Sequence, residues 1–210
     1  MLKKLSLAAA LVLAAPVALS AQITQGTVNF QNGGSVTDGH YYVGPYNGTL
    51  DGKQVSLNCV DFFHEVNNGD TWTVNITPLT GGNLSLTEQP GNLDGYMKSA
   101  FLTGQYAGKT NTQIADIQHA IWTIMGATDP SVDNAAAQAW IDFANNNYMS
   151  SNFNYTDYRI LTDTHAAVTS LGPVTIKQEF LTTTPEPSSL ALLGTGLVGL
   201  VPLTRRRKKA

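Results

Sequence analysis

The hydrophobic residues of this sequence change period twice along the chain, and that change constrains the fold more than any other feature. Apolar and polar residues alternate through much of residues 23–77, as in half-buried β-strands. Between about residues 92 and 147 the apolar residues recur at every third or fourth position, as on one face of an α-helix. Alternation returns at residues 158–161 and 174–181. This order predicts an α+β domain with an antiparallel β-sandwich or barrel-like part and a three-helix insertion.

Turn signals divide the first alternating region into separate strands. Asn47-Gly48 and Asp51-Gly52 are both typical of tight turns between strands. The single cysteine, Cys59, lies on the same face of its predicted strand as Val55 and Leu57, so we expect the thiol to lie inside the domain. The strands are predicted at residues 23–31, 40–43, 54–63, 71–77, 158–161 and 174–181.

The strongest helical pattern covers residues 110–125 and places a glutamine against its apolar stripe. Gln118 lies one turn after Ile114 and one turn before Trp122, both of which belong to or border that stripe. An unsatisfied buried amide costs roughly 1–3 kcal/mol, so we expect Gln118 to have hydrogen-bonding partners in the core.

The ends of this helix also have recognisable signals. Thr110 or Asn111 is the expected N-cap, and Gly126 is the expected C-terminal stop. The other two helices are predicted at residues 92–105 and from Thr128 to about Asn145.

The N-terminal residues have the pattern of a secretory signal peptide. Lys3 and Lys4 precede a short run rich in Leu and Ala, and small residues follow at Ala18 and Ser20. We therefore expect residues 1–20 to be removed, which leaves an exported domain at residues 21–183.

The C-terminal residues combine a short motif, an apolar run and a basic end. Pro185, Glu186 and Pro187 precede the apolar residues 188–204. As a helix that run would measure roughly 25 Å, slightly less than the ~30 Å hydrocarbon core of a bilayer, so we expect a single marginal transmembrane helix. Basic residues hold the cytoplasmic end of such a segment. They are Arg205, Arg206, Arg207, Lys208 and Lys209.

The three parts of this tail, in this order, resemble the PEP-CTERM sorting signal of Gram-negative bacteria. The resemblance covers residues 184–210. It implies that an exosortase, a membrane transpeptidase, recognises the Pro-Glu-Pro motif and processes the tail. The expected route is a transient inner-membrane intermediate followed by the cell surface or the extracellular matrix.

The charge of the exported domain excludes one class of partner. Residues 21–183 contain 5 Lys and Arg residues and 14 Asp and Glu residues, a formal charge of about −9. Binding to nucleic acid phosphates needs clustered basic residues, so we expect no nucleic acid partner. A single cysteine also cannot form an internal disulfide bond.

Cys59 and Gln118 together suggest one specific chemistry. If the thiolate attacks the side-chain carbonyl of Gln118 and ammonia leaves, the product is an internal thioester. Such a bond needs the two residues face to face and water kept away, which a strand-borne Cys among aliphatic residues and a helix-borne Gln near Trp122 can supply.

The residues around this pair resemble the thioester domains of bacterial surface adhesins. Those domains have a cysteine in an aromatic-Cys-x-acid setting, compared with Asn58-Cys59-Val60-Asp61 in a strand here. They also have a Thr-Gln-x-Ala-(Ile/Val)-Trp motif on a later helix, as at residues 117–122. This chain has Ile117 where the family has threonine and Asn58 where it has an aromatic residue. The resemblance implies that Cys59 and Gln118 form the bond and that an incoming amine then attacks it.

Other readings of the same residues remain open. Cys59 and Gln118 can be a packed thiol and a satisfied core amide without any reaction. A cysteine hydrolase would pair Cys59 with His64 or His119, but no local protease signature accompanies them, so we expect no enzyme.

Metal and glycan sites have weaker support. The histidines lack the paired spacing of zinc sites, so neither a metal nor another cofactor is expected. Carboxylates near turns could hold calcium, although the chain has no EF-hand loop. They are Asp38, Asp51, Asp61 and Asp70. A glycan-binding surface could instead use the aromatic residues Tyr41, Tyr42, Tyr46 and Trp72.

The sequence thus predicts an exported, exosortase-processed surface or matrix protein. The first hypothesis is an adhesin-like attachment domain with a Cys59–Gln118 thioester, and its partner would be an amine-bearing surface protein. The alternative is a non-reactive structural component of the extracellular polysaccharide matrix.

Overall fold

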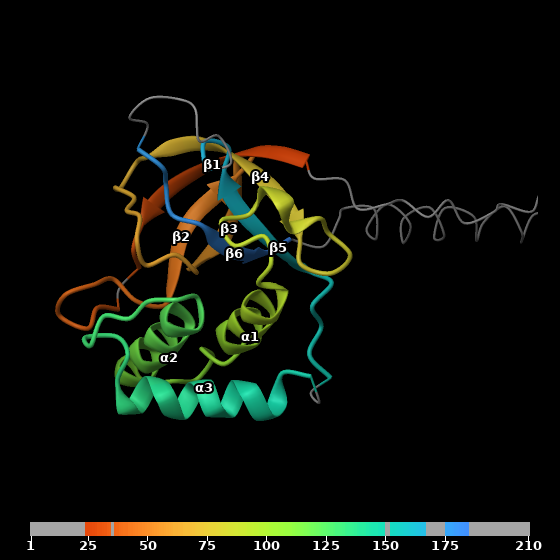
Figure 1. The fold of residues 1–210 in the computed structure, drawn as a ribbon. Coiled ribbons are helices and arrows are strands. Elements are labelled where there is room, and N and C mark those ends of the chain that lie inside the picture. Colours follow the sequence, from red (N-terminus) through yellow and green to blue (C-terminus); the bar gives the residue numbers. More distant parts are fainter. Residues whose placement is uncertain (1–23, 35, 150–151, 167–174, 185–210) are drawn as a thin grey trace, which may run out of the picture.

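The computed structural model describes residues 24–34, 36–149, 152–166 and 175–184. In these residues six strands form a closed antiparallel barrel in the order β1-β2-β3-β6-β5-β4, and three helices lie together on one side of it (Figure 1). The α+β prediction and its barrel-like alternative are therefore confirmed. The strands are β1 Thr24–Asn32, β2 Pro45–Leu50, β3 Lys53–Cys59, β4 Thr71–Pro78, β5 Tyr158–Asp163 and β6 Phe180–Thr183.

The barrel is closed by two strands from the far end of the domain. β5 pairs with β4 along five residues, and the short β6 connects β5 to β3. β6 places Leu181 opposite Asn58 and Phe180 opposite Cys59. The residues that follow the helices in sequence are thus required to complete the sheet.

The interior of the barrel is filled by apolar and aromatic side chains. Phe30 meets Tyr46 edge to face at 5.7 Å between ring centroids and stacks on Phe180 at 6.2 Å. Leu57 and Cys59 belong to the same core, as the alternation of their strand predicts.

The helices cover the outside of the barrel and form a second core. The helices are α1 Leu93–Thr103, α2 Asn111–Ile124 and α3 Ala135–Asn147, and a 3₁₀ turn, η1 Leu84–Leu86, precedes them. Ile117 and Ile121 of α2 pack in one cluster with Ile160 and Leu181, whose strands bury their opposite face in the barrel. Because β5 and β6 are covered on both sides, they are buried at nearly every position instead of at alternate positions.

The predicted ends of α2 are confirmed. Thr110 is the N-cap and forms a capping box with Gln113, so two backbone N–H groups at the helix start have partners. Gly126 follows the last turn with φ of +100°, a conformation that favours glycine.

The predicted start of the third helix is wrong. The helix begins at Ala135 instead of near Thr128, because the Asn134 side chain caps it by accepting hydrogen bonds from the N–H groups of Ala136 and Ala137. A turn around Asp129, whose side chain accepts from Ser131 N–H, occupies the preceding residues.

Three strand predictions and one turn prediction also need correction. Residues 40–43 are not a strand, and the Asn47-Gly48 pair that resembled a turn lies inside β2. The hairpin turn is at Asp51-Gly52, where both residues have positive φ. The strand predicted to continue to residue 63 ends at Cys59, and the described residues 175–179 form no strand before β6.

The glycine inside β2 has a packing reason. A Cβ atom on Gly48 would lie 2.5 Å from the Leu57 side chain and 2.8 Å from the backbone oxygen of Asn29. A glycine therefore allows neighbouring strands to pack closely at this point.

Several predicted segments lie outside the described residues. They are the signal peptide at 1–20, the sorting residues Pro185, Glu186 and Pro187, and the transmembrane segment at 188–204 with its basic end. Within the part of the chain that the structure describes, no helix is long and apolar enough to cross a membrane.

We predict that Gly48→Ala lowers the free energy of unfolding by about 1–3 kcal/mol, because the new methyl group overlaps the core and a neighbouring backbone. Gly91→Ala is the control, because a Cβ there meets no atom within 4 Å. Urea unfolding followed by tryptophan fluorescence measures both. Equal stability of the two variants would contradict the packing argument.

Candidate functional site

The structure brings Cys59 and Gln118 together, although 58 other residues separate them in the sequence. Cys59 ends β3 and Gln118 lies in the middle of α2, and both are fully buried. The Gln118 side-chain Nε2 donates a hydrogen bond to the backbone oxygen of Cys59 at 2.8 Å. This contact joins the barrel to the helical layer.

The Gln118 amide is held in one orientation by two partners. Its Oε1 accepts a hydrogen bond from the Tyr106 hydroxyl at 2.9 Å, while its Nε2 faces the Cys59 backbone. Tyr106 lies in the connection between α1 and α2 and is itself buried. The expectation that this core amide has partners is confirmed, and the partners distinguish its oxygen from its nitrogen.

The Cys59 thiol has two polar neighbours. The thiol donates to the backbone oxygen of Asp61 at 3.0 Å, and Trp122 Nε1 donates to Sγ at 3.4 Å. Burial raises the pKa of Cys59 well above its ordinary value, which the hydrogen bond from Trp122 opposes in part. The resting thiol is therefore neutral near pH 7.

Aromatic rings cover the thiol on the side of the solvent. Trp122 lies 5.8 Å from Tyr41 and 5.3 Å from Phe62, measured between ring centroids. Beyond them is an open cavity of about 490 Å³. Its aromatic lining residues are Phe30, Tyr41, Tyr42, Tyr46, Phe62 and Trp122.

The cysteine–histidine pair of a hydrolase is not formed. His64 Nδ1 lies 2.7 Å from Asp61 Oδ2, and His119 Nε2 lies 2.7 Å from Asp38 Oδ2. Within the described residues, neither histidine is hydrogen-bonded to Cys59. The His64 side chain is partly exposed, and its ring has a buried carboxylate partner in Asp61.

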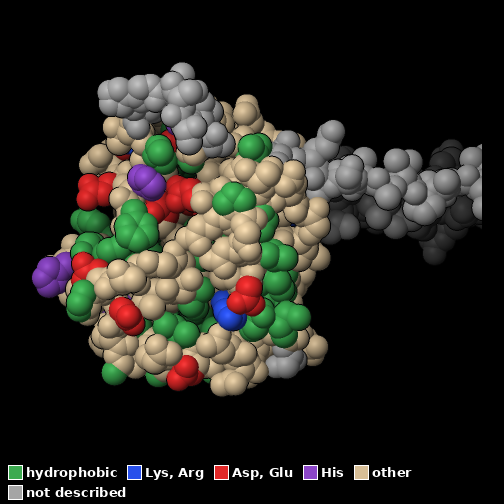
Figure 2. All heavy atoms as spheres, viewed as in Figure 1, with side chains coloured by type: hydrophobic (Ala, Val, Ile, Leu, Met, Phe, Trp, Pro, Cys, Tyr) green, Lys and Arg blue, Asp and Glu red, His purple; other side chains and the backbone are tan. Residues whose placement is uncertain are grey.

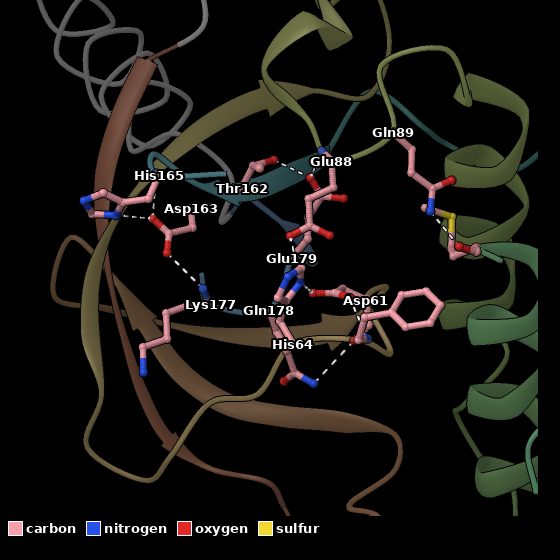
Figure 3. Close-up of polar contacts among 12 residues, drawn as sticks. Asp61, His64, Glu88, Gln89, Thr162, Asp163, His165, Lys177, Gln178 and Glu179 are labelled. Atoms are coloured by element: carbon pink, nitrogen blue, oxygen red, sulfur yellow. Dashed lines mark hydrogen bonds and ion pairs between the residues drawn. The ribbon is translucent and has the colours of Figure 1, made fainter. Parts of the chain in front are cut away.

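A second polar cluster lies beside this site. Asp61 and His64 follow β3, Glu88 follows η1, and Glu179 precedes β6, and Figure 3 shows their side chains gathered in one region. His64 Nδ1 also lies 3.7 Å from Glu88 Oε1. Figure 2 shows acidic side chains beside a histidine on the surface of the barrel part of the molecule.

Glu179 is the most buried member of this cluster. Its carboxylate accepts hydrogen bonds from the hydroxyls of Tyr96 and Thr162 and, at 3.0 Å, from the backbone N–H of Glu88. Burial raises the pKa of Glu179 above its ordinary value, against the effect of these donors. The interactions fix the loop that carries Glu88.

Glu88 lacks a comparable set of donors. Burial, followed by the charges of Asp61 and Glu179, raises the pKa of Glu88 to about 9. Its Oε1 is buried and has no hydrogen-bond partner. Among the described residues, Asp61, His64 and Glu88 are also the one group of three potential metal ligands with donor atoms all within 4.8 Å of one another.

Sequence reasoning did not identify this cluster or the role of Tyr106. Asp61 and His64 are three residues apart, which was a usable local signal, but Glu88 reaches them only through the folding of the barrel. Tyr106 lies just beyond the helix predicted at residues 92–105, and nothing local indicated that its hydroxyl meets Gln118.

Comparison with known proteins identifies the C-terminal segment. Residues 183–208 match the PEP-CTERM protein-sorting motif. The chain therefore carries an exosortase sorting signal, which indicates an exported protein that is processed at the membrane and delivered to the cell surface. Neither the curated proteins nor the solved structures gave a match to this chain.

We predict that the free energy of unfolding falls as pH rises from 4.5 toward about 9 in a metal-free, chelator-containing buffer. In that window the unfolded chain has released the Glu88 proton that the folded chain keeps, so the unfolded state binds fewer protons.

Glu88→Gln should flatten this pH dependence, because the amide has no proton to lose in that range. Glu65→Gln, at an exposed glutamate, is the matched control and should keep the wild-type slope. Urea midpoints at several pH values measure the effect, and equal slopes for all three proteins would refute the assignment to Glu88.

Proposed function

We propose that this protein is an exosortase-processed attachment protein whose barrel-and-helix domain carries a Cys59–Gln118 thioester. The orientation of the Gln118 amide against Cys59 is the observation that supports this proposal most strongly. The amide nitrogen is held at the Cys59 backbone and the amide oxygen at the Tyr106 hydroxyl, so the group has a fixed orientation next to the cysteine that the proposed reaction requires.

The bond would form by acyl transfer within the protein. Cys59 Sγ attacks the side-chain carbonyl carbon of Gln118, the carbon–nitrogen bond breaks, and the amide nitrogen leaves as ammonia with the thiol proton. Charge develops on the carbonyl oxygen during attack, where Tyr106 donates a hydrogen bond in a water-excluded site. Trp122 Nε1 donates to the sulfur and would stabilise the negative charge that the sulfur develops when it loses its proton.

The thioester would then act as an electrophile for an amine on a surface or matrix protein. The amine attacks the acyl carbon, the carbon–sulfur bond breaks, and the thiol takes the proton that the amine releases. The product is an amide bond from Gln118 to the partner. Burial of the pair behind Trp122, Tyr41 and Phe62 limits hydrolysis before the partner arrives.

The alternative function uses the same domain without a reactive bond. A cavity lined by Tyr41, Tyr42 and Tyr46 offers the aromatic faces that sugars commonly stack on. On this reading the protein is a structural component of the extracellular polysaccharide matrix, and Cys59 is a packed thiol with a pKa raised by burial.

Intact mass spectrometry of the exported chain separates the two functions. A thioester predicts a mass lower than the sequence mass by one ammonia, and an adduct with methylamine that is absent in Cys59→Ala. Because the chain has a single cysteine, alkylation reports on Cys59 alone. A full sequence mass with a thiol that is alkylated after unfolding would leave the structural alternative.

We further predict that Tyr106→Phe slows thioester formation by about 10²-fold or more, because the variant loses the donor to the developing oxyanion. Tyr155→Phe is the matched control, since its hydroxyl donates to the backbone oxygen of Tyr148 in the helical layer. The rate of ammonia loss, followed by mass spectrometry after synthesis, measures both. An unchanged rate in Tyr106→Phe would exclude this role for its hydroxyl.

A further inference from the structure

We propose that Asp61, His64 and Glu88 form a binding site for a divalent transition-metal cation, for which Zn²⁺ is the representative ion. The site lies beside the Cys59–Gln118 pair but uses neither residue. It therefore stands independently of the proposed thioester.

The positions of the three donor atoms suit a metal ion. Zinc is bound by His nitrogen and carboxylate oxygen at about 2.0–2.2 Å, which separates tetrahedral donors by roughly 3.3–3.5 Å. His64 Nδ1 lies 2.7 Å from Asp61 Oδ2 and 3.7 Å from Glu88 Oε1, values on either side of that separation. Small side-chain rotations would bring all three donors to one ion.

Glu88 supplies the second observation. The Glu88 side chain is only 16 % exposed, and its Oε1 atom is buried without a hydrogen-bond partner. A carboxylate oxygen in such surroundings is costly unless a proton or a cation neutralises it. The oxygen is also the Glu88 atom that comes within 3.7 Å of the His64 ring.

The charges around the site favour a cation. Asp61, Glu88 and the buried Glu179 lie together, and His64 is the basic partner in the ion pairs that Asp61 and Glu88 make among the described residues. Lys177, from the segment before β6, is instead paired with Asp70 at 2.6 Å. A divalent ion would supply the positive charge that the cluster lacks.

The site also has a route to solvent. His64 lines the open cavity described above, as does Gln178, which donates to the Asp61 backbone oxygen at 3.4 Å. An ion can enter by this cavity, and water from it can fill the remaining coordination position.

The donor set also indicates which class of ion fits. Calcium and magnesium prefer oxygen ligands alone, whereas imidazole nitrogen is a good ligand for Zn²⁺ and its neighbours in the first transition row. Histidine spacing in the sequence predicted no metal site, but spacing could not reveal Glu88 as a third ligand because the barrel brings it there.

Isothermal titration calorimetry with ZnCl₂ tests the site on the full-length chain, purified in detergent without a histidine tag and treated with chelator. We expect one Zn²⁺ to bind per chain and to raise the melting temperature. His64→Ala and Glu88→Gln should each weaken binding by at least about tenfold. CaCl₂ should give no comparable binding.

His165→Ala is the matched control. His165 also pairs with a buried aspartate, since its Nδ1 lies 2.8 Å from Asp163 Oδ1, but within the described residues no third ligand joins that pair. This variant should bind Zn²⁺ like the wild type. Cys59→Ala should do so too, which separates the site from thiolate binding.

The proposal fails if the wild type does not bind Zn²⁺ or binds Ca²⁺ in its place. It also fails if His64→Ala and Glu88→Gln both bind Zn²⁺ as tightly as the wild type, or if His165→Ala alone loses binding. A cobalt spectrum adds a readout that folding defects do not imitate. The visible absorption bands of four-coordinate Co²⁺ should appear in the wild type and in His165→Ala, and should be absent in Glu88→Gln.

Discussion

The position of the helices relative to the barrel depends on one contact, the hydrogen bond from the Gln118 amide to the Cys59 backbone. It connects the end of a barrel strand to the centre of the helix that covers the barrel. The Tyr106 hydroxyl donates a hydrogen bond to the oxygen of the same amide, so Gln118 also holds the loop between α1 and α2. A buried polar network of this kind is favourable only when every member has a partner, and so it fixes one arrangement of barrel and helices.

The sequence predicted much of this fold because local rules agreed with the tertiary structure. Thr110 and Gly126 were found as helix ends because capping depends on nearby backbone groups. Cys59 was placed inside because alternation along one strand decides which face is buried. The turn predicted at Asn47-Gly48 was wrong, because an Asn-Gly pair has the same local sequence whether its glycine forms a turn or allows two strands to pack closely.

The candidate site was only partly accessible to the same reasoning. Cys59 and Gln118 were found because a helix residue that faces the core needs a partner and because the surrounding motif resembles a known family. Glu88 could not be found, because only the folded chain brings its carboxylate beside His64. Tyr106 could not be found, because its hydroxyl reaches Gln118 only when the connection between α1 and α2 packs against α2. Long-range polar contacts leave no period in the chain, so neither hydrophobic pattern nor propensity reports them.

The last strand of the barrel has a geometric consequence for sorting. β6 ends at Thr183, the residue at which the sorting motif begins, and Thr184 is still hydrogen-bonded to the Asp157 backbone at 2.9 Å. The chain thus has no spacer between its folded body and the Pro-Glu-Pro residues. An exosortase that acts on the folded domain would therefore meet the motif directly after a residue that is bonded to the barrel, so the clearance around its catalytic cleft would limit which folded cargo it accepts.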